Sequence, residues 1–477
     1  MKRNILKVLS LVTVVSMLFA LMQIGVSAAA VTNYKITNPY ESVTHLLGNE
    51  ENHYKTNLHT HSTYSDATIP LTEMVKEHYN QDFDILAMAD HGVIGVPWNE
   101  EPTLIPLYQY NPLIGNKQEH FTDEEFEAIL AGTYSDGSTT RTVKNGLQCV
   151  TGAIEGNMLV IQKNHVNGYF MNDNRTEGYL GDEGDFDTII RMIDEAGGIS
   201  HINHPGDWLG SAAGELVYDA DGNVMYTPNG EEMTVGYQIA TDPGNVQFFA
   251  NFFRQYDSCL GIEVYNAFDR PTRTDRVLWD GLLKTIIPEG RNVWGFANND
   301  AHTNEDVDTC FMDFVLPEFS QANVRTAMEN GTFFAVSRYD WGDRIGTTME
   351  YPTVTGIVVD DENDTITITA KNTNAIKWVA DGVYIQEDTV SSNGVCVSTI
   401  KLQDYTADIS CYVRAELNGE GGRTLTQAFV CDDGNMEDLV NREDKINLPA
   451  LDFITVFREI LKTIYNMFVG VVVPEIS

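Results

Sequence analysis

Seven short apolar runs of strand length recur along the chain, and helical patterns separate them. The runs cover about 55–61, 84–90, 147–155, 158–171, 198–204, 260–266 and 293–300. Amphipathic spacing predicts helices at 71–80, 122–130 and 185–196. Strands that alternate with helices form a parallel sheet, because each crossover helix returns the chain to the same edge. The pattern therefore predicts a closed or nearly closed barrel, with its functional site at the carboxyl ends of the strands.

Five of these runs end in side chains that bind metals. The endings are His59-Thr-His61, Asp90-His91, Glu155, His204 and Asp300-Ala-His302. Alternate residues of a strand point to one face, so the imidazoles of His59 and His61 converge, and the turn after them brings Asp66 nearby. Burying so many polar groups without a partner would be costly. Nitrogen and oxygen ligands of this kind suit zinc, manganese or iron(II).

The motifs resemble those of the PHP superfamily, named for polymerase and histidinol phosphatase. The matching segments are HxHxxxSD from His59 to Asp66, ADH at 89–91, the run ending in Glu155, HP at 204–205 and DAH at 300–302, together with an additional histidine segment at His165. The match spans about residues 54–338. This resemblance implies a distorted (β/α)7 barrel, in agreement with the seven runs.

The resemblance also implies how the ligands are shared among two or three divalent metal ions (Zn, Mn or Fe). His59, His61, Glu155 and Asp300 would hold the first, Glu155, His165 and His204 the second, and Asp66, His91 and His302 the third. Glu155 would bridge two of the metals. Family members carry either histidine or aspartate at the position of Asp66, so the third ion is an expectation and not a requirement.

Several neighbouring residues have two interpretations. Asp90 could orient a ligand or accept a proton. Arg270 and Arg273 follow the sixth run and could clamp a phosphate or form surface ion pairs. His201 lies three residues before His204, so on a strand it would face the other way and serve packing. The four histidines His45, His53, His78 and His120 match no motif and receive no role.

The favoured function is a metal-dependent phosphoesterase acting on a nucleotide or another small phosphate ester, either as a phosphomonoesterase or as an exonuclease-like nucleotide hydrolase. Bound metals would activate water and neutralise phosphate oxygens. The alternative is a carbamate or carboxyl-ester hydrolase on the same barrel. The β-rich carboxyl-terminal part of this chain resembles that of PHP-like enzymes with this activity. A second alternative is a non-catalytic, cell-surface metal-binding protein. The printed net charge of −39 argues against broad binding of nucleic acids.

The remaining segments give the domain organisation. Residues 1–30 have a basic start, an apolar middle and an Ala-rich end, which indicates a cleaved signal peptide and a secreted or cell-surface protein; an uncleaved anchor is the alternative.

The barrel is expected at 31–345, with an insertion at 207–255 that is either a lid or a decoration. Alternating runs such as 365–370 predict a small β-sandwich at 350–433. An acidic linker at 434–447 precedes an amphipathic helix and tail at 448–477.

The six cysteines form no CxxC motif, so the sequence supports no thiolate metal site. Secretion permits disulfides. Cys396 and Cys411 lie in neighbouring strand-like runs and could pair, but buried free thiols explain the pattern equally well.

Deleting residues 448–477 tests the carboxyl-terminal helix. Its apolar face includes Phe457, Leu461, Ile464 and Phe468, which is too much apolar surface to leave in water at ~25 cal/mol per Å². We expect the truncated protein to shift from the membrane or protein-bound fraction to the free fraction, because the helix attaches the chain to a partner or the cell surface. An unchanged distribution with a large drop in melting temperature would show instead that the helix packs on the folded body.

Overall fold

The computed structural model describes nine stretches of the chain: 33–102, 120–143, 145–156, 164–172, 185–211, 214–270, 272–348, 350–389 and 394–440. The predicted signal peptide (1–30) and amphipathic helix (448–477) lie outside these residues. The described start of the predicted linker holds a short helix, α10 (Met436–Val440). No helix of the described residues is both long enough and apolar enough to cross a membrane.

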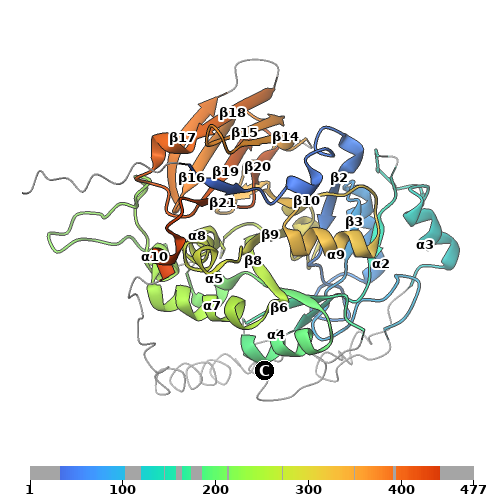
Figure 1. Cartoon of the computed structure of the whole chain (residues 1–477). Helices are drawn as coiled ribbons and strands as arrows, with labels where there is room; N and C mark the ends of the chain where they lie inside the picture. Colours follow the sequence, from blue (N-terminus) through green and yellow to red (C-terminus); the bar gives the residue numbers. More distant parts are fainter. Residues whose placement is uncertain are drawn as a thin grey trace, which may run out of the picture.

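Two sheets carry the seven predicted strands (Figure 1). Three of the strand runs lie in the larger sheet as β2 (His53–Asn57), β3 (Ile85–Ala87) and β4 (Gln148–Val150), which are parallel neighbours. The smaller sheet contains β5 (Ile154–Gly156), β6 (Val166–Tyr169), β7 (Ile199–Ile202), β8 (Cys259–Asn266) and β9 (Trp294–Asn298), in that order. The run at 147–155 is thus divided between the sheets, as β4 and β5.

Both edges of the smaller sheet are joined to the larger sheet. Isolated parallel bridges join Thr60 to Ala301 and His91 to Glu155, so β2 continues toward β9 and β3 continues toward β5. The expectation of a purely parallel sheet is wrong at one strand, because β6 runs antiparallel to both β5 and β7. No long connection is needed between antiparallel neighbours, and the short interval from Gly156 to Val166 fits that arrangement.

The helices confirm the amphipathic patterns. α2 spans Leu71–Asn80, α3 spans Asp123–Leu130 and α4 spans Phe186–Glu195, as predicted to within one residue at each end. Thr122 and Glu125 form a reciprocal capping box at the start of α3. The Asp185 side chain accepts a hydrogen bond from the Thr188 N–H and begins α4. The remaining helices are α5 (Pro205–Leu209), α6 (Val235–Thr241), α7 (Pro243–Gln255), α8 (Asp275–Ile286) and α9 (Gln321–Asn330).

The strands predicted for the β-sandwich are present, but several of them share the larger sheet with β2, β3 and β4. The larger sheet runs from β2 through β10 (Cys310–Val315) and β11 (Phe333–Ser337) to β20 (Gly422–Leu425), β19 (Tyr412–Gly419), β21 (Phe429–Asp432) and β1 (Lys35–Thr37). β16 (Ala375–Ala380) pairs with β19 and β17 (Val383–Thr389). A three-stranded sheet of β14 (Thr353–Asp360), β15 (Thr365–Lys371) and β18 (Val395–Lys401) packs against these strands.

The insertion predicted at 207–255 contains two different parts. α7 packs on α8 and β8 and belongs to the body. Between α5 and α6 the chain forms an arm, residues 214–234, which projects beside α8 in Figure 1. Bridges such as Tyr218 to Val224 and Tyr226 to Glu232 close two tight turns in the arm.

The six cysteines are free and buried, so Cys396 and Cys411 are not joined. The thiols therefore act as small apolar side chains in the cores. Stabilisation comes from packing and from buried ion pairs that join the β-rich part to the barrel.

One buried ion pair connects α8 to β19. The Arg414 guanidinium donates from Nε and Nη2 to the two carboxylate oxygens of Asp280, both at 2.8 Å, and from Nη1 to Glu416 at 2.7 Å. The Tyr412 hydroxyl donates to Asp280 as well. All of these groups are buried, so each charge depends on its partner.

Arg414→Met should lower the free energy of unfolding by about 3–5 kcal/mol, because it leaves Asp280 buried and unpaired. The double variant Arg414→Met/Asp280→Asn removes both charges of this pair and should recover part of the loss. Chemical denaturation of the wild type and of both variants gives the comparison. A double variant less stable than Arg414→Met would contradict the assignment.

Candidate metal centre

The strand extensions bring the His59/His61 motif and the Asp300/His302 motif side by side. The His61 N–H donates to the Ala301 carbonyl at 3.0 Å, and the Asp300 N–H donates to the His59 carbonyl at 3.1 Å. Asp300 has a positive φ of 48°, a conformation that aspartate tolerates better than most residues. This ladder fixes both motifs at the same end of the barrel strands, where sequence analysis expects the site.

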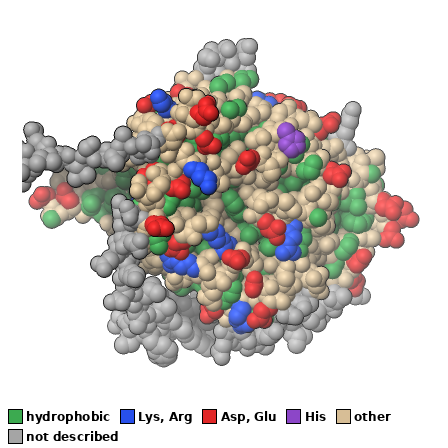
Figure 2. Space-filling view, viewed as in Figure 1, with side chains coloured by type: hydrophobic (Ala, Val, Ile, Leu, Met, Phe, Trp, Pro, Cys, Tyr) green, Lys and Arg blue, Asp and Glu red, His purple; other side chains and the backbone are tan. Residues whose placement is uncertain are grey.

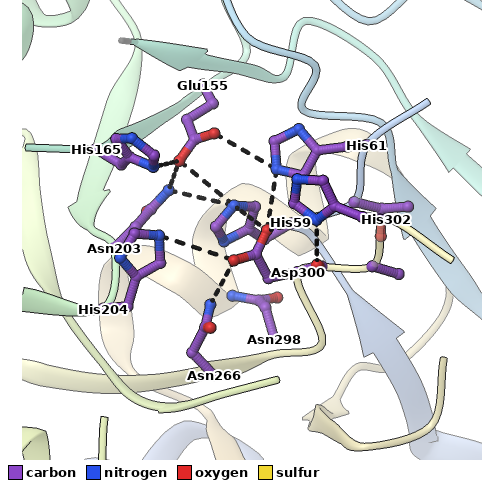
Figure 3. Close-up of polar contacts among 12 residues, drawn as sticks. His59, His61, Glu155, His165, Asn203, His204, Asn266, Asn298, Asp300 and His302 are labelled. Carbon is purple, nitrogen blue, oxygen red and sulfur yellow. Dashed lines mark hydrogen bonds and ion pairs between the residues drawn. The ribbon is translucent and has the colours of Figure 1, made fainter. Parts of the chain in front are cut away.

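The first predicted ligand set is assembled closely (Figure 3). The Asp300 Oδ1 atom lies 3.2 Å from His59 Nε2 and 3.0 Å from His61 Nε2. The two Glu155 oxygens lie 3.4 Å from the same two nitrogens. Two imidazoles and two carboxylates thus point at one another, as the ligands of a single cation would.

The third predicted set lies nearer the surface. Asp66 Oδ1 is 3.2 Å from His302 Nε2, and Asp66 Oδ2 is 3.4 Å from His91 Nε2. His61 completes a group of four whose ligand atoms lie within 4.8 Å of one another. The structure therefore adds His61 to the residues that sequence analysis expects here.

The second predicted set is divided differently in the structure. Glu155 Oε1 lies 3.0 Å from His165 Nδ1, and His91 joins this group. His204 groups instead with His59 and Asp300. The rings of His165 and His204 are nevertheless neighbours, with centroids 5.0 Å apart. Each of the nine predicted ligands belongs to at least one of the four overlapping groups.

Asp90 positions the turn that carries Asp66. Its carboxylate accepts hydrogen bonds from the Ser62 N–H at 2.7 Å, the Ser62 hydroxyl at 2.8 Å and the Ser65 hydroxyl at 2.6 Å. Ser65 in turn lies 3.3 Å from His61 Nδ1. Of the two interpretations of Asp90, this geometry favours the orienting role.

Sequence analysis missed Glu263, which lies in the fully buried strand β8. Its Oε1 atom is 2.8 Å from His59 Nδ1, and its Oε2 atom accepts from the His204 N–H at 3.1 Å. A carboxylate on Nδ1 directs the Nε2 lone pair of His59 toward the cluster. The available signal was a single glutamate inside the apolar run 260–266, where a charge needs a partner.

Two asparagines also hold the carboxylates. Asn203 Nδ2 donates to Glu155 Oε1 at 2.7 Å. Asn266 Nδ2 donates to Asp300 Oδ2 at 3.3 Å and to Glu263 Oε2 at 2.9 Å. These amides orient the carboxylates without adding charge.

The proton affinities of the cluster reflect its mixed charge. Burial alone would lower the pKa of His59, but the carboxylates of Asp300, Glu263 and Glu155 outweigh burial and raise that pKa well above its usual value. For His302 burial likewise opposes a rise, yet Asp66 and Asp300 bring its pKa to about 9. Burial would raise the pKa of Glu155, but the surrounding histidines hold it well below its usual value.

These residues fit a divalent cation. All the ligand atoms are nitrogen or oxygen. Within the described residues, the buried atoms Glu155 Oε2 and His61 Nε2 have ion-pair contacts but no well-aligned hydrogen bond. Without a cation, the nearby carboxylates favour the protonated form of the imidazoles. A bound cation would take the place of those protons. Zinc, manganese or iron(II) suit this ligand set.

The cluster opens on one side. The side chains of Asp66 and His302 are 37% and 33% exposed, whereas those of His59, His61 and Glu155 are at most 1% exposed. A cavity of about 340 Å³ lies against His204, Asp300 and His302. Asp207, Asn266, Ala267 and Asp306 form the rest of its lining. A small molecule could therefore reach the cluster from this side.

The two predicted substrate-binding arginines do not line this cavity. Arg270 is exposed and covers Gly342. Arg273 stacks on the Trp341 ring, 5.0 Å from its centroid. His201 is buried and stacks on Phe296 with ring centroids 4.4 Å apart, as expected of a packing histidine, but its Nε2 atom also lies 3.4 Å from Glu263 Oε1.

Comparison with known proteins finds limited similarity. No family model and no curated protein matches the chain. A two-domain protein from Bacteroides vulgatus that contains a predicted PHP-like metal-dependent phosphoesterase is 15% identical, with a TM-score of 0.38 over 79% of this chain and 95% of that one. A protein from Bifidobacterium adolescentis described as a metal-dependent phosphoesterase is 11% identical, with a TM-score of 0.27 over 58% and 96%.

A third solved structure, PsfC from Pseudomonas syringae, is 13% identical, with a TM-score of 0.30 over 59% of this chain and 88% of that one. At these scores the similarity carries no functional argument. The assignment of the site therefore depends on the residues and geometry of this chain.

Glu263→Gln should weaken metal binding about 10- to 100-fold, because it removes the charge that orients His59. Metal affinity is measured by competition with a chelator of known affinity. His201→Phe is the matched control, since it removes the other histidine near Glu263 but keeps the ring stack. Unchanged affinity in Glu263→Gln would show that Glu263 does not position His59.

Proposed function

We propose that the protein is a metal-dependent phosphoesterase whose site holds two or three divalent ions. The observation that carries this proposal is the convergence of nine nitrogen and oxygen ligand residues in four overlapping groups beside an open cavity. We also infer that the two sheets are the halves of one distorted (β/α)7 barrel, since bridges join both edges of the smaller sheet to the larger one. The sequence motifs that resemble the PHP superfamily support the same reading.

The ligand assignment follows the observed distances. His59, His61, Glu155 and Asp300 would hold one ion, and Asp66, His91 and His302 a second, with His61 between them. Glu155 would also serve a third ion with His165, and His204 would approach from the Asp300 side. Divalent ions held in this way acidify coordinated water and neutralise the charge on phosphate oxygens.

The protein's own residues would position the substrate and the ligands. Glu263, Asn203 and Asn266 fix the orientation of His59, Glu155 and Asp300. Asp207 and Asp306 border the cavity, and no lysine or arginine is found among its described lining residues. Charge neutralisation of a phosphate would therefore come from the metals, and the cavity's size fits a small ester and not a long polymer.

Loss of His59 or Asp300 should abolish hydrolysis. We expect His59→Ala and Asp300→Ala to reduce the rate about a thousandfold or more, since each variant removes a ligand of the most buried group. Elemental analysis should show lower metal content in the same proteins. His201→Ala is the control and should keep both metal and activity. Normal turnover by Asp300→Ala would exclude this site as the centre of reaction.

A substrate panel separates the phosphoesterase from the other hydrolases. The metal-loaded protein is assayed with phosphate monoesters, dinucleotides and aryl carbamates in parallel. We expect the highest kcat/KM for a phosphate ester. A carbamate that reacts much faster than every phosphate ester would overturn the proposal while leaving the metal site intact. Absence of all hydrolysis at full metal content would favour a binding protein.

A further inference from the structure

A second and larger cavity, of about 400 Å³, lies where the arm, α8 and the β-rich part meet. The arm contributes Glu231, α6 contributes Tyr237, α8 contributes Lys284, and the β-strands contribute Lys377 and Tyr384. The second turn of the arm, which contains Asn229, is fixed to the turn between β16 and β17. Asn229 Nδ2 donates to the Gly382 carbonyl, and Asn229 Oδ1 accepts from the Tyr384 N–H. Small-molecule sites of about 300–1,000 Å³ are common at such junctions.

The floor of this cavity is a preformed polar network. Arg276 forms two hydrogen bonds with Asp269, at 2.7 and 3.0 Å, and lies 3.5 Å from Asp340. Arg423 donates to the other oxygen of Asp340 at 3.3 Å. The Arg414 network described above forms the neighbouring part of the floor. A ligand here would meet rigid, charged groups whose orientation is already set.

The charge of the cavity differs from that of the whole protein. The chain has 69 acidic and 30 basic residues, and Figure 2 shows acidic side chains spread over the molecular face. Among the described residues, by contrast, the cavity lining contains six of each kind. The basic residues are Arg273, Arg276, Lys284, Lys377, Arg414 and Arg423, and the acidic ones are Glu231, Glu232, Asp280, Asp340, Asp381 and Glu416.

The guanidinium N–H groups of Arg273 form no hydrogen bond within the described residues. Its one ionic partner there is Glu231, whose Oε2 atom lies 3.6 Å from Arg273 Nη2, and no hydrogen bond to its guanidinium is found in that part of the chain. The guanidinium stacks on Trp341. The side chain is 38% exposed, so its N–H groups are available to a ligand.

Trp341 is held in a strained backbone conformation at the cavity wall. It forms the two-residue turn between β12 (Tyr339–Asp340) and β13 (Asp343–Arg344) together with Gly342, and the two φ angles are 54° and 86°. Turns with two positive φ angles favour asparagine, aspartate or glycine, and a bulky residue there is an outlier. Such strain is retained where the side chain serves a function.

We propose that this cavity is a carbohydrate-binding site, separate from the metal centre. Hydroxyl groups both donate and accept hydrogen bonds, and a lining with equal numbers of cationic donors and anionic acceptors suits a ligand that does both. The balanced charge gives no preference to an anion or a cation, and the charged floor disfavours an apolar ligand. Tyr237, Trp341 and Tyr384 also line the cavity, and sugar C–H groups pack against aromatic rings. Arg273 and Lys377 already lie over one face of the Trp341 and Tyr384 rings, respectively.

Saturation-transfer NMR on the full chain tests the proposal. The probes are neutral disaccharides of glucose, galactose, mannose and N-acetylglucosamine, with AMP as a nucleotide probe. We expect at least one disaccharide to bind with a Kd of about 1 mM or tighter. Arg273→Ala should weaken that binding about tenfold, whereas Arg254→Ala, an exposed arginine of α7 away from the cavity, should not change it.

Trp341→Asn distinguishes a binding role from a structural one. Asparagine suits the turn, so this variant should raise the melting temperature by about 1–3 °C while it weakens disaccharide binding about tenfold. The proposal is overturned if no disaccharide binds, or if binding persists unchanged in Arg273→Ala and Trp341→Asn. It is also overturned if AMP, and not a sugar, gives the signal that Trp341→Asn removes.

Discussion

The fully buried carboxylate of Glu155 lies within ion-pair distance of four imidazoles, and the rest of the site is arranged around it. His59, His61, His91 and His165 approach it at 3.4, 3.4, 2.7 and 3.0 Å. A lone carboxylate at this depth would be prohibitively costly. The strands that meet at Glu155 must therefore deliver compensating groups to one point. This requirement explains why polar residues end so many barrel strands and why the ends of β2 and β9 are locked together by the hydrogen bonds of His61 and Asp300.

Local patterns of the sequence were sufficient for the predicted helices and for part of the ligand cluster. The helix at 71–80 was predictable because its apolar residues repeat at helical spacing, and Asp185 marked the start of α4. The endings at His59/His61, His91, Glu155, His204 and Asp300/His302 were predictable because polar side chains follow apolar runs. His165 precedes β6, and it entered the predicted ligand set only through the resemblance to the PHP superfamily, as did the division of the ligands among the metals.

Features that depend on pairing between distant segments were not predictable in this way. β6 has an apolar pattern that is the same in either direction, so its antiparallel orientation leaves no local trace. The pairing of β20 with β11 ties the β-rich part to the barrel sheet, although the change of pattern near residue 350 suggested a separate module. Arg273 lies close in sequence to the metal-site strand β8, but the arm and the Trp341 turn place its side chain in another cavity.

The connection between β8 and α8 joins the two cavities physically. At its beginning, Asn266 donates to Asp300 of the metal centre. Three residues later, the buried carboxylate of Asp269 accepts from Arg276 and from the Trp341 N–H at 3.0 Å, both at the second cavity. Ala267 and Asp269 have positive φ angles of 46° and 58°, respectively. The segment from Asn266 to Asp269 is therefore strained, and contacts hold it at both ends. Asn266 and Asp269 therefore connect the metal centre to the second cavity within four residues of the chain.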